Sequence, residues 1–380
     1  MMKVILNVFI VVALCAATVL IVEGIHAIAL GSRLEGSITS RAYQVIAQSI
    51  TGGGHADTDA RDHEGPAFTR LLQRDEIDPL IPKLKAAAVG LGNSDYRVLQ
   101  RKAAAINVRE EGCLVQKPNL RKTLTYLRSN LFNPLDPLTM FYDRDRDLDP
   151  EIKKLVESYG VRLVAFTTNA QGERITVPTV TSDHKVVVAG DSVAVGDMVD
   201  DAETISSQLQ VLDPTRQYVN IGIGGADAAD VVCALEKAGR RYKGQIEELI
   251  YVYCDNDINP TKPYGTPREV LDWLKHFANA EGIPKVTVVY APFIYNIVPQ
   301  FTRFRGYKGW DHPTHAIERA ALSELVAEAG FRYIDISDLA LQEINRAKTQ
   351  FAALSVFSDH VHLSPYGITR LVERLRLLPY

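Results

Sequence analysis

The sequence predicts an α/β protein. Its centre is a three-layer α/β/α domain with a five-stranded parallel sheet, preceded by an N-terminal transmembrane helix and a mainly helical membrane-proximal region. Two observations carry this prediction: an uncharged apolar run at residues 4–22, and five short apolar runs after residue 180 that alternate with amphipathic stretches. With 380 residues, the chain is long enough for about two domains. We expect an anchor at 1–30, the helical region at 31–180 and the α/β domain at 181–380.

The N-terminal run, "VILNVFIVVALCAATVLIV", lies between Lys3 and Glu23 and carries no charge. It is long enough to cross a bilayer as a helix, whereas the apolar part of a cleaved signal peptide is usually shorter. The small-residue stretch "AIA" at 27–29 keeps cleavage open as an alternative. The isolated Lys3 favours a short tail inside, so we expect a single-pass signal anchor with the bulk of the chain extracytoplasmic, in the periplasm or at the cell surface.

Residues 31–180 are expected to be mainly helical, and "NLRKTLTYLRSNLF" at 119–132 is the clearest helix among them. The acidic stretch that follows has Asp143, Asp145 and Asp147 at the first spacings of a calcium-binding loop. However, Leu148 stands where such a loop needs glycine, and Lys154 stands where it needs its last acid. A solvated acidic turn is therefore favoured over a calcium site.

After residue 180, apolar runs typical of buried parallel strands alternate with helical spacing. The expected strands are "KVVVAG", "QYVNIGIG", "ELIYVYC", "KVTVVYAPF" and "RYIDIS". The expected helices include "ADAADVVCALEKAG", "PREVLDWLKHFANAEG", "THAIERAALSELVAEAG" and "SPYGITRLVERLRLL". Right-handed crossovers place the carboxyl ends of all the strands at one edge of the sheet, where ligands collect in open α/β sheets.

Polar residues and glycines follow these strand ends, and further polar residues precede the last helix. They are Asp191 and Ser192; Asn220, Gly222, Gly224 and Gly225; Asn256 and Asp257; and Asp359, His360 and His362. Each group alone has a structural explanation, because Ser192 or Asp359 can cap a helix and glycines allow close packing. The glycine loop lacks the last glycine of a dinucleotide motif, where Asp227 stands. Together the groups supply a hydroxyl, a base, a carboxylate and oxyanion donors, the parts needed for acyl transfer.

The stretch around Ser192 does not match the α/β-hydrolase elbow GxSxG, because Ala194 stands where that pattern has its last glycine. From about residue 186 to the end, the chain resembles instead the SGNH, or GDSL-type, hydrolases. "GDSV" is similar to their first block, Gly225 falls on the oxyanion glycine, and "CDNDI" is similar to GxND with Asn256 matching. "DHVHLSPYG" is similar to the DxxH block. Cys254 departs from the pattern, since the family has glycine there.

This resemblance implies a role for each matching residue. Ser192 would be the nucleophile, His362 its base and Asp359 the residue that orients the imidazole. The oxyanion hole would consist of the backbone N–H groups of Ser192 and Gly225 with the Asn256 amide. No cofactor is implied, neither a metal nor a nucleotide.

Upstream, "TTNAQGERITVPT" and "EGIHAIALGSR" resemble membrane-anchored bacterial members of this superfamily. The resemblance implies a serine esterase acting on acyl esters, O-acetyl in particular, of extracytoplasmic polysaccharide. Three alternatives stay open: a carbohydrate O-acyltransferase with the same triad, a lipid esterase, and a non-catalytic polysaccharide assembly or binding protein.

The expected partners are an acylated carbohydrate and the membrane. In the stretch 300–315, Tyr307 and Trp310 are candidates for stacking on sugar rings, and Arg303 and Arg305 for meeting acidic sugars. A solvated loop over packed aromatics explains the same stretch equally well. A net charge of −4 gives no reason to expect nucleic-acid binding. The four cysteines have no zinc-site spacing, and a disulfide between Cys113 and Cys233 stays open.

Overall fold

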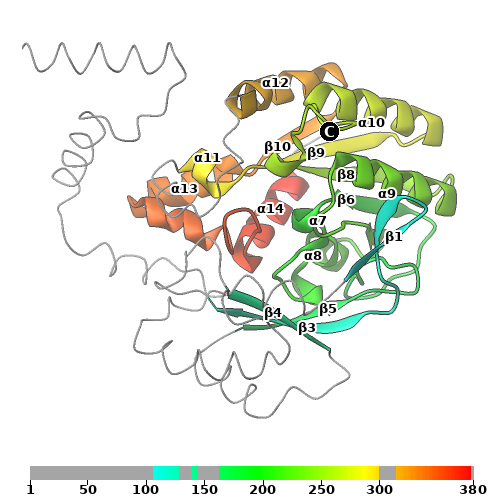
Figure 1. Ribbon diagram of the computed structural model, residues 1–380, viewed down its shortest axis with the longest axis horizontal. Helices are drawn as coiled ribbons and strands as arrows, with labels where there is room; N and C mark the ends of the chain where they lie inside the picture. Colours follow the sequence, from blue (N-terminus) through cyan, green and yellow to red (C-terminus); the bar gives the residue numbers. More distant parts are fainter. Residues whose placement is uncertain (1–105, 128–137, 144–161, 299–313, 378–380) are drawn as a thin grey trace, which may run out of the picture. The chain divides into compact units, whose positions relative to one another are not determined.

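The centre of the protein is a five-stranded sheet in the order β10-β9-β8-β6-β7, with every pairing parallel. The computed structural model describes residues 106–127, 138–143, 162–298 and 314–377 (Figure 1). The strands are β6 (Lys185–Gly190), β7 (Gln217–Asn220), β8 (Ile246–Cys254), β9 (Lys285–Ala291) and β10 (Arg332–Asp335). The parallel sheet predicted from the five apolar runs is therefore confirmed.

Helices cover both faces of this sheet (Figure 1). On one face lie α9 (Ala228–Arg241), α10 (Pro267–Glu281) and α12 (Thr314–Glu328), and on the other lie α8 (Ile205–Leu212), α13 (Ser337–Ala347) and α14 (Pro365–Leu377). The side chains of β6 divide between the two layers, because successive residues of a strand point to opposite faces. Val188 belongs to the apolar cluster of α8 and α14, and Val187 to that of α9 and α10.

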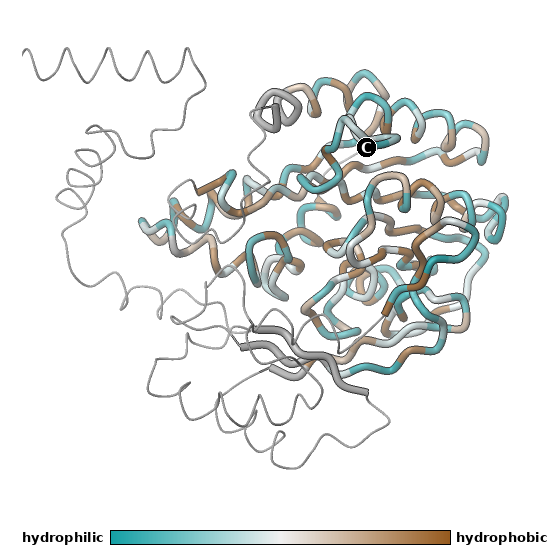
Figure 2. The backbone as a smooth tube through the Cα atoms, viewed as in Figure 1, coloured by the Kyte–Doolittle hydropathy of each residue, from teal (hydrophilic) through white to brown (hydrophobic). Residues whose placement is uncertain are grey.

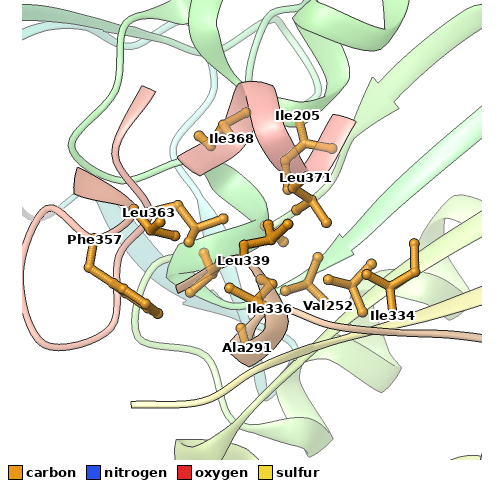
Figure 3. Close-up of a cluster of buried hydrophobic side chains, with 14 of the residues drawn as sticks. Ile205, Val252, Ala291, Ile334, Ile336, Leu339, Phe357, Leu363, Ile368 and Leu371 are labelled. Carbon is orange, nitrogen blue, oxygen red and sulfur yellow. The ribbon is translucent and has the colours of Figure 1, made fainter. Parts of the chain in front are cut away.

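Each layer is held by buried apolar side chains. All six residues of β6 are buried, and Figure 2 shows the apolar strands enclosed by helices of mixed hydropathy. In Figure 3, Ile205 of α8, Leu371 of α14 and Val252 of β8 meet in one of the two clusters. Burying side chains of this size stabilises the fold by about 1.5–3 kcal/mol each. This packing fixes the carboxyl ends of the strands, where the predicted site residues lie.

The described part of the region before residue 180 consists of strands. An antiparallel hairpin pairs β1 (Asn107–Glu110) with β2 (Cys113–Gln116), and a three-stranded antiparallel sheet has the order β4-β3-β5. Its strands are β3 (Arg121–Leu127), β4 (Leu138–Asp143) and β5 (Arg162–Thr167). The prediction of a mainly helical region is wrong for these residues.

The error is clearest at 119–132, predicted as a helix, because residues 121–127 form the central strand of that sheet. Leu124 lies opposite Phe141 of β4 and Val164 of β5. The threonines at 123 and 125 and Tyr126 also favour a strand, since β-branched and aromatic side chains fit a pleated surface. Pairing with two distant segments therefore outweighs the local helical spacing.

A disulfide links Cys113 of β2 to Cys233 of α9, which the sequence had left open. Among the residues that the structure describes, no helix has the length and apolarity needed to cross a bilayer. The apolar run at 4–22, predicted to be the anchor, lies outside those residues.

Candidate active site

Ser192 stands at a sharp turn where the strand β6 passes directly into the short helix α7 (Ser192–Val195). The turn requires glycine at 190, where φ is +145° and a Cβ would lie 2.5 Å from the carbonyl oxygen of Val252. The N-cap of α7 is Asp191, whose Oδ1 accepts a hydrogen bond of 2.9 Å from the Val193 N–H. The Ser192 hydroxyl is therefore not the helix cap; it donates to Asp191 Oδ2 at 3.4 Å.

His362 and Asp359 form a tightly connected pair in the loop before α14. Asp359 Oδ1 accepts the backbone N–H groups of Val361 and His362, at 2.8 and 2.7 Å, and its Oδ2 lies 2.6 Å from His362 Nδ1. When the ring is neutral, a carboxylate at Nδ1 keeps the proton on that nitrogen and leaves Nε2 as the acceptor. His362 Nε2 is buried and has no hydrogen-bond partner among the described residues.

The carboxylates around His362 set its charge. Burial acts to lower the pKa of His362, but Asp359, Asp197 and Asp191 outweigh it and raise that pKa to about 9. For Asp359, burial acts to raise the pKa, but His362 and His360 outweigh it and hold the pKa well below its ordinary value. At neutral pH the pair is therefore an imidazolium held by a carboxylate.

Asp197 is a site residue that the sequence analysis missed. The left-handed C-cap Gly196 turns the chain after α7, and the Oδ2 atom of Asp197 comes to lie 4.0 Å from His362 Nε2. Burial raises the pKa of this carboxyl. The repeated Gly-Asp pair in "GDSVAVGD" was the available signal, since a glycine directly after a helix marks a reversal of the chain.

Asn256 lies in the short 3-10 helix η2 (Asp255–Asp257) that follows β8. Its Nδ2 donates to Asp191 Oδ2 at 2.9 Å, so one carboxylate oxygen contacts both the Ser192 hydroxyl and the Asn256 amide. Asp257 stabilises this turn by accepting the Cys254 N–H at 2.9 Å. Cys254, which departs from the family pattern, is fully buried in the apolar cluster of α8 and α14.

Gly225 occupies the turn Ile223–Ala226 after β7, which is closed by a 3.1 Å hydrogen bond from the Ala226 N–H to the Ile223 carbonyl. Gly225 has a φ of +74°. Gly222 brings this loop against the serine helix, because a Cβ there would lie 2.2 Å from the Val195 nitrogen. Gly224 likewise approaches Asp197, whose Oδ2 would lie 2.9 Å from an added Cβ. The loop after β7 thus packs directly on α7 and on Asp197.

The structure therefore brings two pairs of predicted residues together. Ser192 and Asn256 both donate to Asp191, and Asp359 contacts His362. Gly225 reaches the same edge through the packing of its loop on α7. Tyr307, Trp310, Arg303 and Arg305 lie outside the described residues. Within the described ranges, no three or more His, Cys, Asp or Glu residues are grouped to hold a metal ion. The assembled groups have the chemistry of nucleophilic acyl transfer.

No protein-family model and no curated protein matches the chain. Several solved structures are similar to it at low identity. A lipolytic protein of the G-D-S-L family from Veillonella parvula is 16% identical, with a TM-score of 0.39, over 51% of this chain and 98% of that one. A lipase/acylhydrolase from Enterococcus faecalis is 16% identical, with a TM-score of 0.39, over 50% and 93% of the two chains.

A catalytic mutant of an acetylxylan esterase from Geobacillus stearothermophilus is 15% identical, with a TM-score of 0.38, over 52% of this chain and 94% of that one. One of these solved structures is thus described as a member of the lipolytic G-D-S-L family.

Proposed function

We propose that this protein is a GDSL-type serine esterase with Ser192 as nucleophile, His362 as base and Asp359 as the residue that orients the imidazole. The observation that carries the proposal is the Asp359–His362 pair, in which His362 Nε2 is buried and has no hydrogen-bond partner among the described residues. Ser192 lies at the same edge of the sheet, and its hydroxyl does not cap the helix, because Asp191 does so. A buried polar atom without a hydrogen-bond partner costs free energy, and a role in the reaction explains why such an atom is kept.

The reaction begins when neutral His362 takes the proton of the Ser192 hydroxyl while the oxygen attacks an ester carbonyl carbon. The developing oxyanion accepts hydrogen bonds from the N–H groups of Ser192 and Gly225 and from the Asn256 amide. The alcohol leaves with the proton from His362, and a water molecule, activated by the same nitrogen, releases the acyl group as an acid. In the ligand-free site the hydroxyl faces Asp191, so the first step requires it to turn toward His362.

The test is Ser192→Ala, assayed by hydrolysis of a small aryl acetate and by fluorophosphonate labelling. We expect a folded protein whose kcat falls by several orders of magnitude, because base and nucleophile act as one unit. Ser182→Ala, in the loop before the start of β6, is the matched control and keeps wild-type turnover. A folded Ser192→Ala variant with wild-type kcat contradicts the mechanism, and wild-type protein without activity or labelling favours a binding protein.

For the substrate we propose O-acetyl esters of an extracytoplasmic polysaccharide. The support is the stretch at 300–315, with Tyr307 and Trp310 for sugar rings and Arg303 and Arg305 for acidic sugars. A panel of acetylated polysaccharides, long-chain lipid esters and aryl acetates tests the proposal. Preference for long-chain lipid esters contradicts it, and acetyl transfer to a sugar acceptor in place of water makes the protein a transferase.

A further inference from the structure

The hairpin β1–β2 contacts the turn that carries Gly225, although the two are more than 100 residues apart in the chain. Asn107 Nδ2 donates to the Gly224 carbonyl at 2.5 Å, across a sequence separation of 117 residues. Gln116, which pairs with Asn107 across the hairpin, donates from Nε2 to the Gly222 carbonyl. The side chains at the open end of the hairpin therefore hold the backbone of the loop after β7.

The bond to Gly224 determines where the next N–H group points. The Gly224 carbonyl and the Gly225 N–H belong to one planar trans peptide, so they point in opposite directions. Asn107 binds the carbonyl, and the Gly225 N–H accordingly faces away from the hairpin. This N–H is the group proposed above to receive the oxyanion.

The turn itself does not choose this orientation. It has the type II pattern, because among its two central residues only Gly225 has a positive φ. Rotation of the central peptide converts type II to type I and reverses both the carbonyl and the N–H. Glycine adopts either sign of φ at similar cost, so with glycine at both central positions neither form is excluded by sterics. A contact from outside the turn has to select one of them.

The hairpin is attached to the helix that follows this turn. The disulfide Cys113–Cys233 joins β2 to α9 covalently. Asp230 of α9 accepts the Leu114 N–H at 3.1 Å and pairs with Arg109 at 3.1 Å. Asn107 is thus held in place by three links between the hairpin and one helix.

We propose that Asn107 is a positioning residue for the oxyanion hole, and that the disulfide-tethered hairpin keeps it in register so that full activity requires the Cys113–Cys233 bond. The proposal rests on the esterase function above. Its physical content is that Asn107 selects the orientation of the Gly224–Gly225 peptide before substrate arrives. A preorganised donor costs no rearrangement when the oxyanion forms, which is why such donors contribute strongly to rate.

The first experiment compares Asn107→Ala and Asn107→Asp in the full-length, detergent-solubilised protein, with a small aryl acetate as substrate. The aspartate has the same shape as asparagine but presents a carboxylate to the Gly224 carbonyl, so it tests the hydrogen bond and not the packing. We expect kcat to fall by about 10- to 100-fold, no more than the lower end of the roughly 10²- to 10³-fold that loss of one oxyanion donor costs, with KM unchanged. Glu110→Ala, exposed on the same strand, is the control and keeps wild-type kcat.

The affinity for a trifluoromethyl ketone reports on the oxyanion hole itself, because the ketone forms a hemiketal oxyanion with the serine. A purely structural role of Asn107 would leave this affinity unchanged. The affinity should fall by the same factor as kcat/KM in both Asn107 variants, while circular dichroism stays unchanged. Variants that keep wild-type kcat and wild-type ketone affinity overturn the proposal. So does a loss that appears in KM alone.

The second experiment removes the disulfide with the pair Cys113→Ser and Cys233→Ser. When Asn107 is present, we expect the two serine substitutions to lower kcat. When they are combined with Asn107→Ala, we expect little loss beyond that of Asn107→Ala alone, because the disulfide and Asn107 act through the same contact. Multiplicative losses overturn the coupling between the disulfide and Asn107. Failure of the esterase function is distinguishable, since wild-type protein would then show no Ser192-dependent turnover.

Discussion

At the scale of single residues, the site is governed by the charges around His362. Asp359 lies 2.6 Å from Nδ1, and Asp197 lies 4.0 Å from Nε2, so both ring nitrogens face a carboxylate. Asp191 adds a third negative neighbour, and together these groups overcome the effect of burial and raise the pKa of His362 to about 9. A base with that pKa is largely protonated at neutral pH and cannot accept the serine proton.

This charge arrangement predicts an alkaline esterase. Because only neutral His362 acts as the base, kcat/KM should rise with pH up to about 9. In Asp197→Asn one raising charge is removed, so the pKa of His362 falls and the rising limb should move to lower pH. Recording kcat/KM between pH 5 and 10 for both proteins checks this, with the exposed Asp183→Asn as control. An unshifted limb in Asp197→Asn would show that this carboxylate does not act on the base.

At the scale of elements, Arg174 joins the strand β5 to the turn after the serine helix. Its guanidinium is completely buried and donates to the carbonyls of Gly196 at 2.6 Å and Val199 at 2.7 Å. It also pairs with Asp201 at 3.1 Å and lies over the Phe166 ring at 4.2 Å. Asp197 lies between Gly196 and Val199 in the sequence, so this arginine holds the segment that faces His362.

We therefore predict that Arg174 is required for both stability and activity. Arg174→Ala should destabilise the fold by about 3 kcal/mol, because the buried Asp201 loses this ion pair and the carbonyls lose the guanidinium as a donor. Arg370→Ala, which removes an exposed pair with Glu373, should cost less than about 1 kcal/mol. Thermal unfolding of the two variants and wild type measures the difference. Similar melting temperatures for the two variants would contradict the role of Arg174.

At the scale of the whole molecule, we propose a membrane-anchored protein with its catalytic domain outside the cytoplasm. The apolar run at 4–22 supports the anchor. The Cys113–Cys233 disulfide supports the location, because disulfides persist in oxidising compartments and are rare in the cytosol. The two arguments are independent, since they rest on different parts of the chain.

The expected behaviour of the whole protein follows from this proposal. It should sediment with membranes, resist extraction by high salt and dissolve in detergent, and its Cys113 and Cys233 should resist alkylation until a reductant is added. Fractionation, thiol alkylation and determination of the N-terminus measure these properties. A mature chain that begins at Leu30 would contradict the anchor, and thiols that react without a reductant would contradict the oxidising location.

The sequence alone was sufficient for the central sheet, because a strand buried on both faces must be apolar at every position, as β6 is. It also predicted Ser192 and Asn256, which directly follow buried strands, and Asp359 and His362, which precede the last helix, as the candidate site residues. Within Gly190-Asp191-Ser192, however, only the structure decided that Asp191 is the cap. Either residue type can cap a helix, and the choice depends on the backbone at the turn.

Tertiary structure alone decided the remaining parts. Residues 121–127 have a pattern that reads as a helix, and they form a strand because two partners distant in the chain, β4 and β5, pair with both of their edges. The roles of Asn107, Asp197 and Arg174 could not be read from their local sequence, since each acts through a carbonyl or a ring that the fold brings to it. A local pattern records which faces of a segment are buried, whereas contacts across more than a hundred residues depend on how the whole chain packs.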